Sequence, residues 1–372
     1  KLAITGFSNS GKTTIFNALT GLNLDTAIYP TPASAEVKPH IGIVKVPDKR
    51  LNRLSSLYKD KKKIHTTVEY VDYPGITSAY SGGDISQNTR VFDVIRDADA
   101  IVHVVRVFKD DSVIHPFGII DPLRDVQSFE TELILGDLEF AEKRLERMEL
   151  AWKKGLKQDE GDREFLLKCK KALEGEISLR NISFSDKEKM VMLSFQLLSI
   201  KPEIIVLNIG EADLNTEKAG KAASAIENYF KDKGSDNVSP VIPLCGKIEM
   251  EIAQLQQEEA KMFLDDLGIS EPAMNRLCRV SYDTLGLISF FTIGKKEVRA
   301  WAIKKGTRAI KAAGKVHTDM ERGFIRAETI HFEDFIASGE NMVKAREKGL
   351  VRLEGKTYIV NNGDIINFKF NV

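Results

Sequence analysis

The chain has 372 residues, of which 42% are hydrophobic, and its 54 Lys and Arg balance its 54 Asp and Glu. A chain of this length can bury a sizeable core and form two or three domains, whereas the zero net charge confines any nucleic-acid contact to a local patch. The three cysteines, Cys169, Cys245 and Cys278, are far apart, which argues against a disulfide framework or a zinc site. No run of 18 apolar residues and no signal peptide is recognisable, so we expect a cytoplasmic protein with no membrane partner.

A glycine-rich loop lies near the start of the chain. Residues 6–13 read Gly-Phe-Ser-Asn-Ser-Gly-Lys-Thr, between the apolar run 2–4 and the helix-like stretch 14–19. In a loop of this kind, backbone N–H groups at a helix N-terminus surround phosphates, the lysine reaches the β- and γ-phosphates and the hydroxyl ligates Mg²⁺. The sequence predicts a nucleoside-triphosphate site with Thr13 as a metal ligand, and its nucleotide-binding residues are Asn9, Ser10, Gly11, Lys12, Thr13 and Thr14.

Short apolar segments alternate with helix-like segments as far as about residue 124, which is the pattern of a parallel α/β sheet. Strands of the same kind return after an interruption. We therefore expect one nucleotide-binding domain made of residues 1–124 and 201–280, with strands over 2–5, 41–46, 67–71, 101–105, 203–207 and 241–244.

A second motif, Asp72-Tyr73-Pro74-Gly75, follows the third of these strands. A D-x-x-G segment places its aspartate near Mg²⁺, usually through a water, and its glycine N–H near the γ-phosphate. We predict catalytic roles for Lys12, Thr13, Asp72 and Gly75. Ile76 stands where Ras-type enzymes carry the glutamine that orients the attacking water, so intrinsic turnover should be slow.

The interruption, residues 125–200, has a helical pattern. Two apolar stripes at spacings of three and four residues predict a pair of antiparallel helices, and a polar break separates them. The charged outer faces are either solvated surface or a docking site for a partner. The stripes consist of Leu138, Ala141, Leu145, Met148 and Trp152, and of Phe165, Leu166, Cys169 and Leu173.

A third motif, Asn208-Ile209-Gly210-Glu211, stands where guanine-specific P-loop proteins carry N-K-x-D. Glu211 is one methylene longer than aspartate, and Ile209 replaces the lysine that packs on the ring. Guanine specificity is therefore in doubt, and adenine, which offers an N6 amine, is a candidate base. After the next strand, Cys245-Gly246-Lys247 occupies the place of a loop that contacts the base through backbone N–H groups.

Residues 281–372 form a separate small α+β domain in this interpretation, with strands over 287–292, 298–303, 356–360 and 365–370. Its stretch 295–315 is basic, and Trp301 and Phe324 are candidate exposed aromatics. Such a surface is compatible with RNA backbone or serves only solubility. The basic residues are Lys295, Lys296, Arg299, Lys304, Lys305, Arg308, Lys311 and Lys315.

With these motifs the chain resembles the YchF/Obg-like ATPase family of translation-factor-related P-loop GTPases, over nearly its whole length. The resemblance rests on the phosphate loop with Asn9 and on a series of longer runs. They are Val46-Pro47-Asp48, Arg50-Leu51, His103-Val104-Val105-Arg106, Asp121-Pro122-Leu123-Arg124-Asp125, Thr131 to Leu135 with Asp137-Leu138-Glu139, Leu285 to Ile288, Phe290-Phe291-Thr292, Glu297 to Trp301, Gly314 to Asp319 and Phe324 to Glu328.

The resemblance implies a P-loop NTPase domain, a helical-hairpin insert and a C-terminal TGS domain of the ubiquitin-like β-grasp type. It implies Mg²⁺-dependent hydrolysis with ATP preferred over GTP, and association with ribosomes or RNA through the TGS and helical domains. It also indicates His115 as a candidate for orienting the attacking water, K⁺ as a candidate activator through Asn9, and Thr31 or Ser34 as the second metal ligand. We expect a monomer.

Three interpretations of the function remain open. The protein is either a nucleotide hydrolase acting as a regulatory switch, or an RNA- or ribosome-binding adaptor in which nucleotide sets conformation and hydrolysis is incidental. A GTP-preferring GTPase is the third possibility, although the base motif departs from N-K-x-D at two positions.

Overall fold

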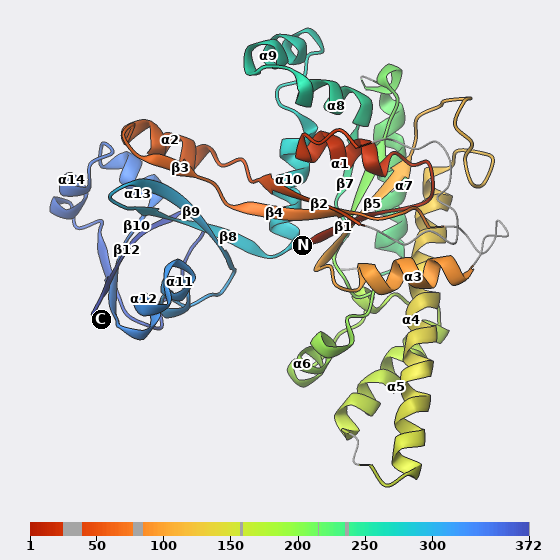
Figure 1. Ribbon diagram of the computed structural model, residues 1–372. Helices are drawn as coiled ribbons and strands as arrows, with labels where there is room; N and C mark the ends of the chain where they lie inside the picture. Colours follow the sequence, from red (N-terminus) through yellow and green to blue (C-terminus); the bar gives the residue numbers. More distant parts are fainter. Residues whose placement is uncertain (25–38, 77–84, 157–158, 215, 235–237, 372) are drawn as a thin grey trace. The chain divides into compact units, whose positions relative to one another are not determined.

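The computed structural model describes residues 1–24, 39–76, 85–156, 159–214, 216–234 and 238–371. They form two compact units, one made of Lys1–Gly42 and Glu69–Met274 and the other of Ile43–Val68 and Asn275–Val372. Each unit has its own six-stranded sheet (Figure 1). No helix in these ranges has the length and apolar character needed to cross a membrane.

The sheet of the first unit has the order β2-β4-β1-β5-β6-β7. Strand β1 pairs in parallel with β4 and β5, β5 pairs with β6, and β6 pairs with β7. All seven residues of β5 are buried, as expected for a parallel strand covered on both faces. The strands are β1 (Leu2–Thr5), β2 (His40–Lys45), β4 (Thr67–Asp72), β5 (Ala100–Arg106), β6 (Glu203–Asn208) and β7 (Val241–Leu244).

Helices lie on both faces of this sheet, with α1 on one side and α3 on the other (Figure 1). The apolar side chains of α3 and the first half of α4 pack on β1, β4 and β5, whereas α7 and α8 enclose a core with β6 and β7. The helices are α1 (Lys12–Thr20), α3 (Ile85–Ile95), α4 (Pro122–Lys153), α5 (Glu160–Glu174), α6 (Asp186–Phe195), α7 (Glu217–Asp232), α8 (Gly246–Gln254) and α9 (Gln257–Asp266), with 3₁₀ turns η2 (Leu179–Asn181) and η3 (Glu211–Asp213).

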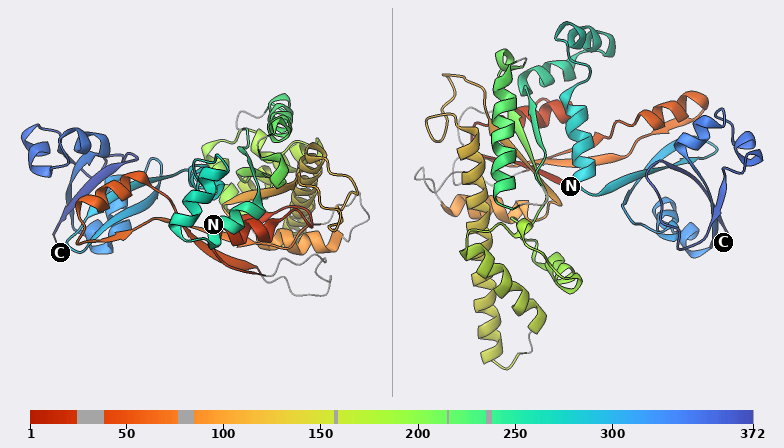
Figure 2. Two further views of the ribbon diagram at one scale, coloured as in Figure 1. Left: turned by 90° about the horizontal axis from the view of Figure 1, so that it is seen from above. Right: turned by 180° about the vertical axis from the view of Figure 1, so that it is seen from behind.

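The predicted helix pair is present, but α4 begins within the sheet's own core. Asp121 caps this 32-residue helix by accepting from the Arg124 N–H, and Pro122 occupies its first position. Its first half buries Phe129 and Leu133 against the sheet. Its second half pairs with α5 (Figure 2). The core between them includes Leu145 and the free thiol of Cys169. The insert and the nucleotide domain are therefore one unit.

The sheet of the second unit has the order β11-β10-β12-β8-β9-β3. Strand β8 is antiparallel to β9, and β10 is antiparallel to both β11 and β12, whereas β8 and β12 are parallel. The elements are β3 (Lys62–Ile64), β8 (Leu287–Ile293), β9 (Glu297–Lys304), β10 (Phe324–His331), β11 (Arg352–Glu354) and β12 (Asp364–Phe370), with helices α2 (Lys49–Leu57), α10 (Ala273–Thr284), α11 (Ala309–Val316), α12 (Thr318–Arg322), α13 (Phe332–Ala337) and α14 (Met342–Glu347).

The domain boundaries differ from the expected ones at two places. Residues 43–68, expected in the nucleotide-binding domain, belong to the second unit, as do residues 275–280. Strand β3 pairs in parallel with β9, and α2 buries Leu51 and Leu54 in the same core as Phe291 and Phe335. This assignment depends on pairing between segments far apart in the chain, which local sequence patterns do not report.

Two further expectations about the second unit are corrected. Residues 356–360 form no strand and make only an isolated bridge, between Ile359 and Arg308. Phe324 is buried at 5% exposure because its ring packs against Phe368 in the core, so it is not a surface aromatic. Trp301 is half-buried, and the Arg299 guanidinium lies 4.0 Å from its ring centre.

Candidate nucleotide-binding site

The phosphate loop connects β1 to α1, and its two glycines are required by close contacts. A Cβ on Gly6 would lie 2.4 Å from the Val104 carbonyl oxygen, and one on Gly11 would lie 2.1 Å from the Asn208 amide nitrogen. Both glycines also have positive φ. Helix α1 begins at Lys12, so its free N–H groups and the loop N–H groups form an anion site at a helix N-terminus.

Lys12 lies inside this loop with 7% of its surface exposed. Its Nζ donates to the Phe7 carbonyl oxygen over 2.8 Å. Burial lowers the pKa of Lys12 to about 8, and the nearby Asp72 carboxylate opposes this shift. The amine is therefore held beside the loop that would surround the phosphates, in a setting that favours an anionic ligand.

Thr13 and Asp72 join the phosphate loop to the D-x-x-G segment. The Thr13 hydroxyl donates to Asp72 Oδ2 over 2.8 Å, while the buried Oδ1 has no hydrogen-bond partner among the described residues. Burial raises the pKa of Asp72, whereas the Thr13 hydrogen bond and Lys12 act in the opposite direction. A hydroxyl beside an unsatisfied carboxylate oxygen is the oxygen donor set that Mg²⁺ prefers, so these residues fit the expected metal.

The other expected metal ligands, Thr31 and Ser34, lie outside the described residues. In the described part of the chain, no group of three or more His, Cys, Asp or Glu side chains is arranged to hold a metal ion. A resident ion would therefore depend on phosphate oxygens and water as well as on Thr13 and Asp72.

Gly75 packs directly on the phosphate loop. A Cβ at Gly75 would lie 2.7 Å from Ser8 Cα and 2.8 Å from Lys12 Nζ. The following residue, Ile76, donates its N–H to the Gly6 carbonyl oxygen over 3.1 Å, and its side chain is fully buried. Ile76 therefore packs in the core and offers no polar group to an attacking water.

Asn208 connects the phosphate loop to the loop after β7. Its Nδ2 donates to the Ser10 carbonyl oxygen and its Oδ1 accepts from the Gly246 N–H, both over 3.0 Å. Thr14 of α1 borders the same junction, since a Cβ on Gly246 would lie 3.5 Å from its methyl group. The expected base residue Asn208 thus uses its amide to hold two binding loops together.

The remaining base-site residues differ in their exposure. Glu211 is largely exposed and lies 3.7 Å from the Lys247 amine. Ile209 is 4% exposed and Cys245 is 3% exposed, so the isoleucine side chain packs in the core beneath the site rather than on its surface. Ser10, also buried, contributes its carbonyl to Asn208.

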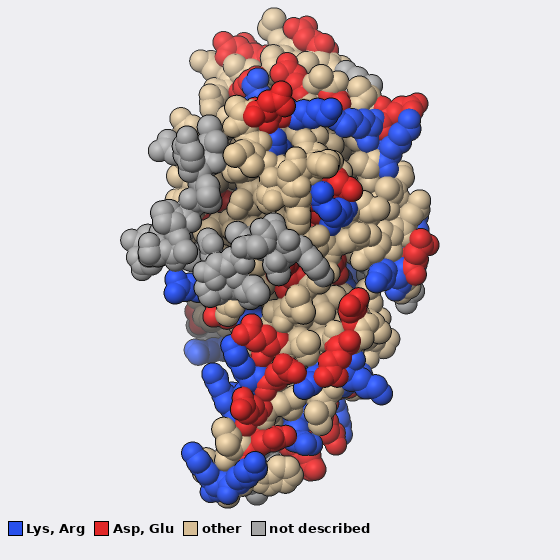
Figure 3. Space-filling model, turned by 90° about the vertical axis from the view of Figure 1, so that its right-hand side faces the viewer, with Lys and Arg blue, Asp and Glu red and all other residues tan. Residues whose placement is uncertain are grey.

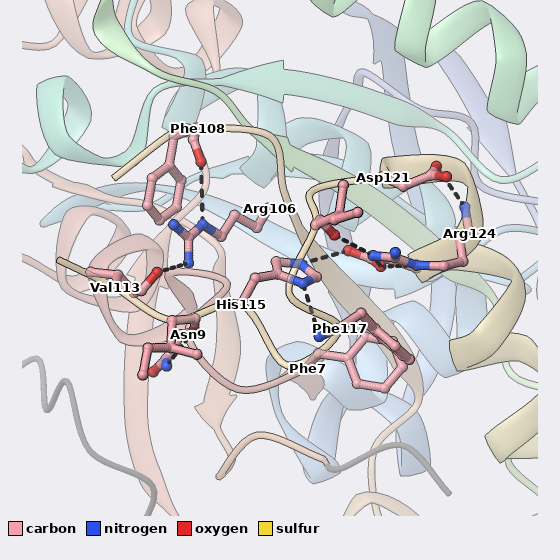
Figure 4. A network of polar contacts seen from close by, with 12 residues as sticks. Phe7, Asn9, Arg106, Phe108, Val113, His115, Phe117, Asp121 and Arg124 are labelled. Atoms are coloured by element: carbon pink, nitrogen blue, oxygen red, sulfur yellow. Dashed lines mark hydrogen bonds and ion pairs between the residues drawn. The ribbon is translucent and has the colours of Figure 1, made fainter. Parts of the chain in front are cut away.

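His115 is buried in the loop after β5. Its Nδ1 accepts from the Phe117 N–H over 3.2 Å, which places the proton of the neutral ring on Nε2, and Nε2 donates to Asp125 Oδ2 over 3.0 Å (Figure 4). Both ring nitrogens are occupied in this arrangement. The catalytic role expected for His115 stays a prediction, and it requires the loop to rearrange.

The sequence interpretation gave no role to two residues at this site. Arg106, at the end of β5, is buried and donates to three carbonyl groups of the following loop. Phe108 is half-buried beside Gly11 and Gly210, whose hypothetical Cβ atoms would lie 3.9 and 3.8 Å from its side chain. An arginine that ends an otherwise apolar strand is the signal by which this network can be recognised.

The phosphate loop, the D-x-x-G segment and the Asn208 segment meet at one edge of a parallel sheet, which defines a P-loop nucleotide-binding protein of the GTPase fold. A family model described as a 50S ribosome-binding GTPase matches residues 1–134. A model of the C-terminal region of YchF GTPases, described as a protein of unknown function, matches residues 287–371.

Comparison with whole proteins gives the family. The chain is 42% identical to the ribosome-binding ATPase YchF of Bacillus subtilis, over 99% of this chain and 98% of that protein. It is 40% identical to the ribosome-binding ATPase YchF of Haemophilus influenzae, over 100% and 99% of the two chains. The structure of the Schizosaccharomyces pombe YchF GTPase matches with a TM-score of 0.78 at 29% identity, over 99% and 97% of the chains. This chain belongs to the YchF family.

Proposed function

We propose that this protein is a Mg²⁺-dependent nucleoside triphosphatase that prefers ATP over GTP and acts as a ribosome- or RNA-associated switch. The observation that carries the proposal is the Thr13–Asp72 hydrogen bond beside the buried Lys12 amine, where Asp72 Oδ1 has no hydrogen-bond partner in the described part of the chain. The printed names of the bacterial relatives, which are ribosome-binding ATPases, support the choice of activity and partner.

The chemistry assigned to this site is transfer of the γ-phosphoryl group to water. The loop N–H groups and Lys12 would stabilise the negative charge on the phosphates, and the D-x-x-G motif assigns the Gly75 N–H to the γ-phosphate. Thr13 and Asp72 would hold the metal, Thr13 as a direct ligand and Asp72 through a water. When bound, Mg²⁺ would supply charge neutralisation for the transferred phosphoryl group.

The preference for ATP rests on Glu211, the exposed carboxylate in the place of the guanine-reading aspartate. The adenine N6 amine is a single donor, whereas guanine presents N1–H and N2 donors together and suits a closely placed bidentate carboxylate. Calorimetric titration of the protein with ATP and GTP, with Mg²⁺ present, tests this assignment. Tighter GTP binding would favour a GTPase, which the printed name of the fission yeast relative also suggests.

The Glu211→Asp variant sharpens this test, because a shorter carboxylate should shift the preference towards GTP. Glu217→Asp is the matched control, since Glu217 is also an exposed glutamate and forms an ion pair with Lys221 on its own helix, α7. An unchanged ATP-to-GTP ratio in Glu211→Asp would remove Glu211 from the account of base preference.

A second candidate function, an adaptor whose nucleotide only sets conformation, is favoured by one observation. Ile76 is buried and both ring nitrogens of His115 are occupied, so neither side chain is placed to orient a water. Turnover measured with and without ribosomes separates the two functions. A switch ATPase should be stimulated several-fold or more, whereas an adaptor should bind ribosomes in a nucleotide-dependent manner with no stimulation.

The proposal also includes K⁺ activation, a cytoplasmic location, a monomeric state and a TGS domain. K⁺ would act through Asn9, whose Nδ2 is engaged by the Ile114 carbonyl, which leaves Oδ1 as the acceptor of that amide. Exchanging K⁺ for Na⁺ at constant ionic strength tests this role. We also propose a cytoplasmic monomer in which the second unit is the TGS domain.

We propose that two surfaces contact RNA or ribosomes. Charged side chains of both signs cover the helical hairpin (Figure 3). In the second unit, cations of the 295–315 stretch are exposed, namely Lys295, Lys296, Lys304, Lys305, Arg308, Lys311 and Lys315. Reversing the charge of Lys304 and Lys305 should weaken ribosome binding and reduce its dependence on salt.

A further inference from the structure

Arg106 closes the loop after β5 around its own guanidinium. Its Nε donates to the Phe108 carbonyl oxygen over 3.2 Å, Nη1 to that of Val113 over 2.9 Å and Nη2 to that of Asp110 over 3.0 Å. The guanidinium carbon also lies 4.5 Å from the centre of the Phe108 ring. A buried cation is costly unless its donors are used, and these three carbonyl groups use them.

The same loop is fixed on its far side. His115, immediately after the residues that Arg106 holds, binds Asp125 at the start of α4 through Nε2 and accepts from the Phe117 N–H. Figure 4 shows these contacts on either side of residues 113–115. The carbonyl group of Ile114 is therefore held between two anchored neighbours, Val113 and His115.

That carbonyl is the one that contacts the phosphate loop. Asn9 Nδ2 donates to the Ile114 oxygen over 3.0 Å. Asn9 has φ of 63°, a left-handed conformation that is uncommon for a non-glycine residue and that asparagine tolerates better than most. Asn9 is also one of the residues whose N–H groups line the phosphate-binding loop, so its conformation affects how the loop receives a phosphate.

We propose that Arg106 is a positioning residue for the nucleotide site: by ordering residues 107–114 it places the Ile114 carbonyl that holds Asn9, and so sets the conformation of the phosphate loop. This role rests on the proposed function, because it requires a nucleotide at residues 6–13. Arg106 itself touches no ligand atom in this scheme. Its effect on affinity passes through Asn9.

The test is a double-mutant cycle on Mg·ADP affinity, measured by calorimetry for the wild-type chain, Arg106→Lys, Asn9→Ala and the double variant. Lysine retains the charge but cannot direct donors to three carbonyl groups from a planar fork. Each single change should weaken ADP binding by roughly 3- to 10-fold, the worth of one hydrogen bond. Both changes break the same series of contacts, from Arg106 through Ile114 to Asn9. The double variant should therefore bind ADP about as well as whichever single variant has the lower affinity.

Ser112→Ala is the matched control. It removes a hydrogen bond within the same loop, from the Ser112 hydroxyl to Asp110 Oδ1, and leaves the carbonyl groups that Arg106 holds. ADP affinity should be unchanged in this variant. A loss equal to that of Arg106→Lys would overturn the proposal, because general loosening of the loop would then explain both.

Hydrogen exchange keeps the proposal testable if Arg106→Lys does not fold. ADP should slow amide exchange across residues 107–114 in the wild-type chain and not in Asn9→Ala. The role of Arg106 would be overturned if ADP slowed amide exchange equally in the two proteins. It would also be overturned if the affinity losses of the two single variants multiplied in the double variant. Either result would leave the nucleotide site intact. Failure of wild-type protein to bind ADP or ATP would instead overturn the proposed function, and this role with it.

Discussion

The hydroxyl of Thr13, at the start of α1, donates to Asp72 Oδ2, at the end of β4, over 2.8 Å. This contact joins the two segments that any P-loop enzyme must bring together before it can hold Mg²⁺ beside a triphosphate. Because Asp72 Oδ1 is buried without a hydrogen-bond partner among the described residues, the carboxylate retains an acceptor that the proposed Mg²⁺ site would use.

Replacing Asp72 with asparagine should therefore raise the Mg²⁺ concentration that half-saturates turnover by about 10- to 100-fold, the usual cost of losing a group that supports a metal through a bound ligand. Titration of ATPase activity with Mg²⁺ measures this. Thr13→Ser retains the hydroxyl and should behave nearly as the wild-type chain. An unchanged metal requirement in Asp72→Asn would remove Asp72 from the metal site.

The buried Lys12 should make nucleotide binding pH-dependent. Its pKa is about 8 in the unliganded protein, and phosphates raise it again by favouring the charged amine. At pH 8.5 binding should therefore take up a proton, and affinity should fall as the pH rises above 8. Calorimetry in two buffers of different ionisation enthalpy detects the proton. Lys12→Ala should bind weakly with no uptake at this pH, and uptake that persists there would assign the proton to another group.

The same Lys12 pKa bears on the stability of the unliganded protein. Between pH 8 and the ordinary lysine pKa of 10.5, the unfolded chain binds more protons at this lysine than the folded chain does. The contribution of Lys12 to the free energy of unfolding therefore rises with pH across that window. Subtracting the denaturation profile of Lys12→Met from that of the wild-type chain isolates this slope.

Glu130 should make the free energy of unfolding depend on pH in the opposite direction to Lys12. Glu130 and Glu203 share the Arg180 guanidinium, and Glu203 also binds His103 Nδ1. Burial, reinforced by the charge of Glu203, raises the pKa of Glu130 to about 7. A raised carboxyl pKa stabilises the fold at low pH, so the contribution of Glu130 should be lost as the pH rises from 4.5 through 7.

The Glu130→Gln variant tests this dependence, because it removes the titration and retains the shape. Urea denaturation at pH 5 and pH 7.5 should show a smaller difference between the two pH values for the variant than for the wild-type chain. Glu139→Gln changes a half-exposed residue of α4 that pairs with Lys143, and it should leave the difference unchanged. Equal pH differences in wild-type and Glu130→Gln proteins would contradict the assignment.

Gly75 should not tolerate a side chain. A Cβ there would lie 2.7 Å from Ser8 Cα, a backbone atom that cannot move aside cheaply. Gly75→Ala should therefore cost about 1–3 kcal/mol of stability as an overpacked site, and it should abolish turnover by displacing the D-x-x-G segment from Lys12. Thermal unfolding and ATPase assays measure the two effects.

Gly220, on α7, is the matched control for this change. A Cβ at Gly220 meets no atom within 4 Å, so alanine should raise stability by about 0.5–1 kcal/mol through helix propensity. Comparable melting temperatures for Gly75→Ala and Gly220→Ala would show that the D-x-x-G segment moves away from the phosphate loop without cost.

The second unit should respond to mutations in a segment near the N-terminus. Leu54, on α2, is fully buried with residues of β8 and α13. Leu54→Ala should destabilise this unit by about 2–5 kcal/mol, seen as faster amide exchange over residues 287–371, while ADP affinity stays unchanged. Exchange that accelerates only in residues 69–274 would contradict the assignment of α2 to the second unit.

The sequence patterns predicted the nucleotide-binding fold well, because its signals are local. The phosphate loop has fixed spacing, and buried parallel strands such as residues 101–105 and 203–207 read as apolar runs. The structure then brought Lys12, Thr13, Asp72 and Gly75 together as the motifs required. The extent of α4 was predicted less well, since its apolar residues serve two different cores.

What the sequence did not indicate depends on contacts between distant segments. Nothing local distinguishes the short strand β3 from a surface loop, and its place is set by pairing with β9. Ile209 was assigned to the base site by position, yet packing decides that its side chain is buried. For His115, the residue could be named, but its partners Asp125 and Phe117 emerge only from the folded loop.

The pairing of β3 with β9 has a consequence for the order in which the molecule is made. A ribosome produces residues 43–68 early and the strands that receive them last, and at roughly 5–20 residues per second the delay is tens of seconds. The first unit consists of Lys1–Gly42 and Glu69–Met274, so all of it is synthesised before β9 exists. A nascent chain can thus complete its phosphate loop while α2 and β3 still await their partners, and nucleotide captured at that stage would stabilise the half-finished protein during translation.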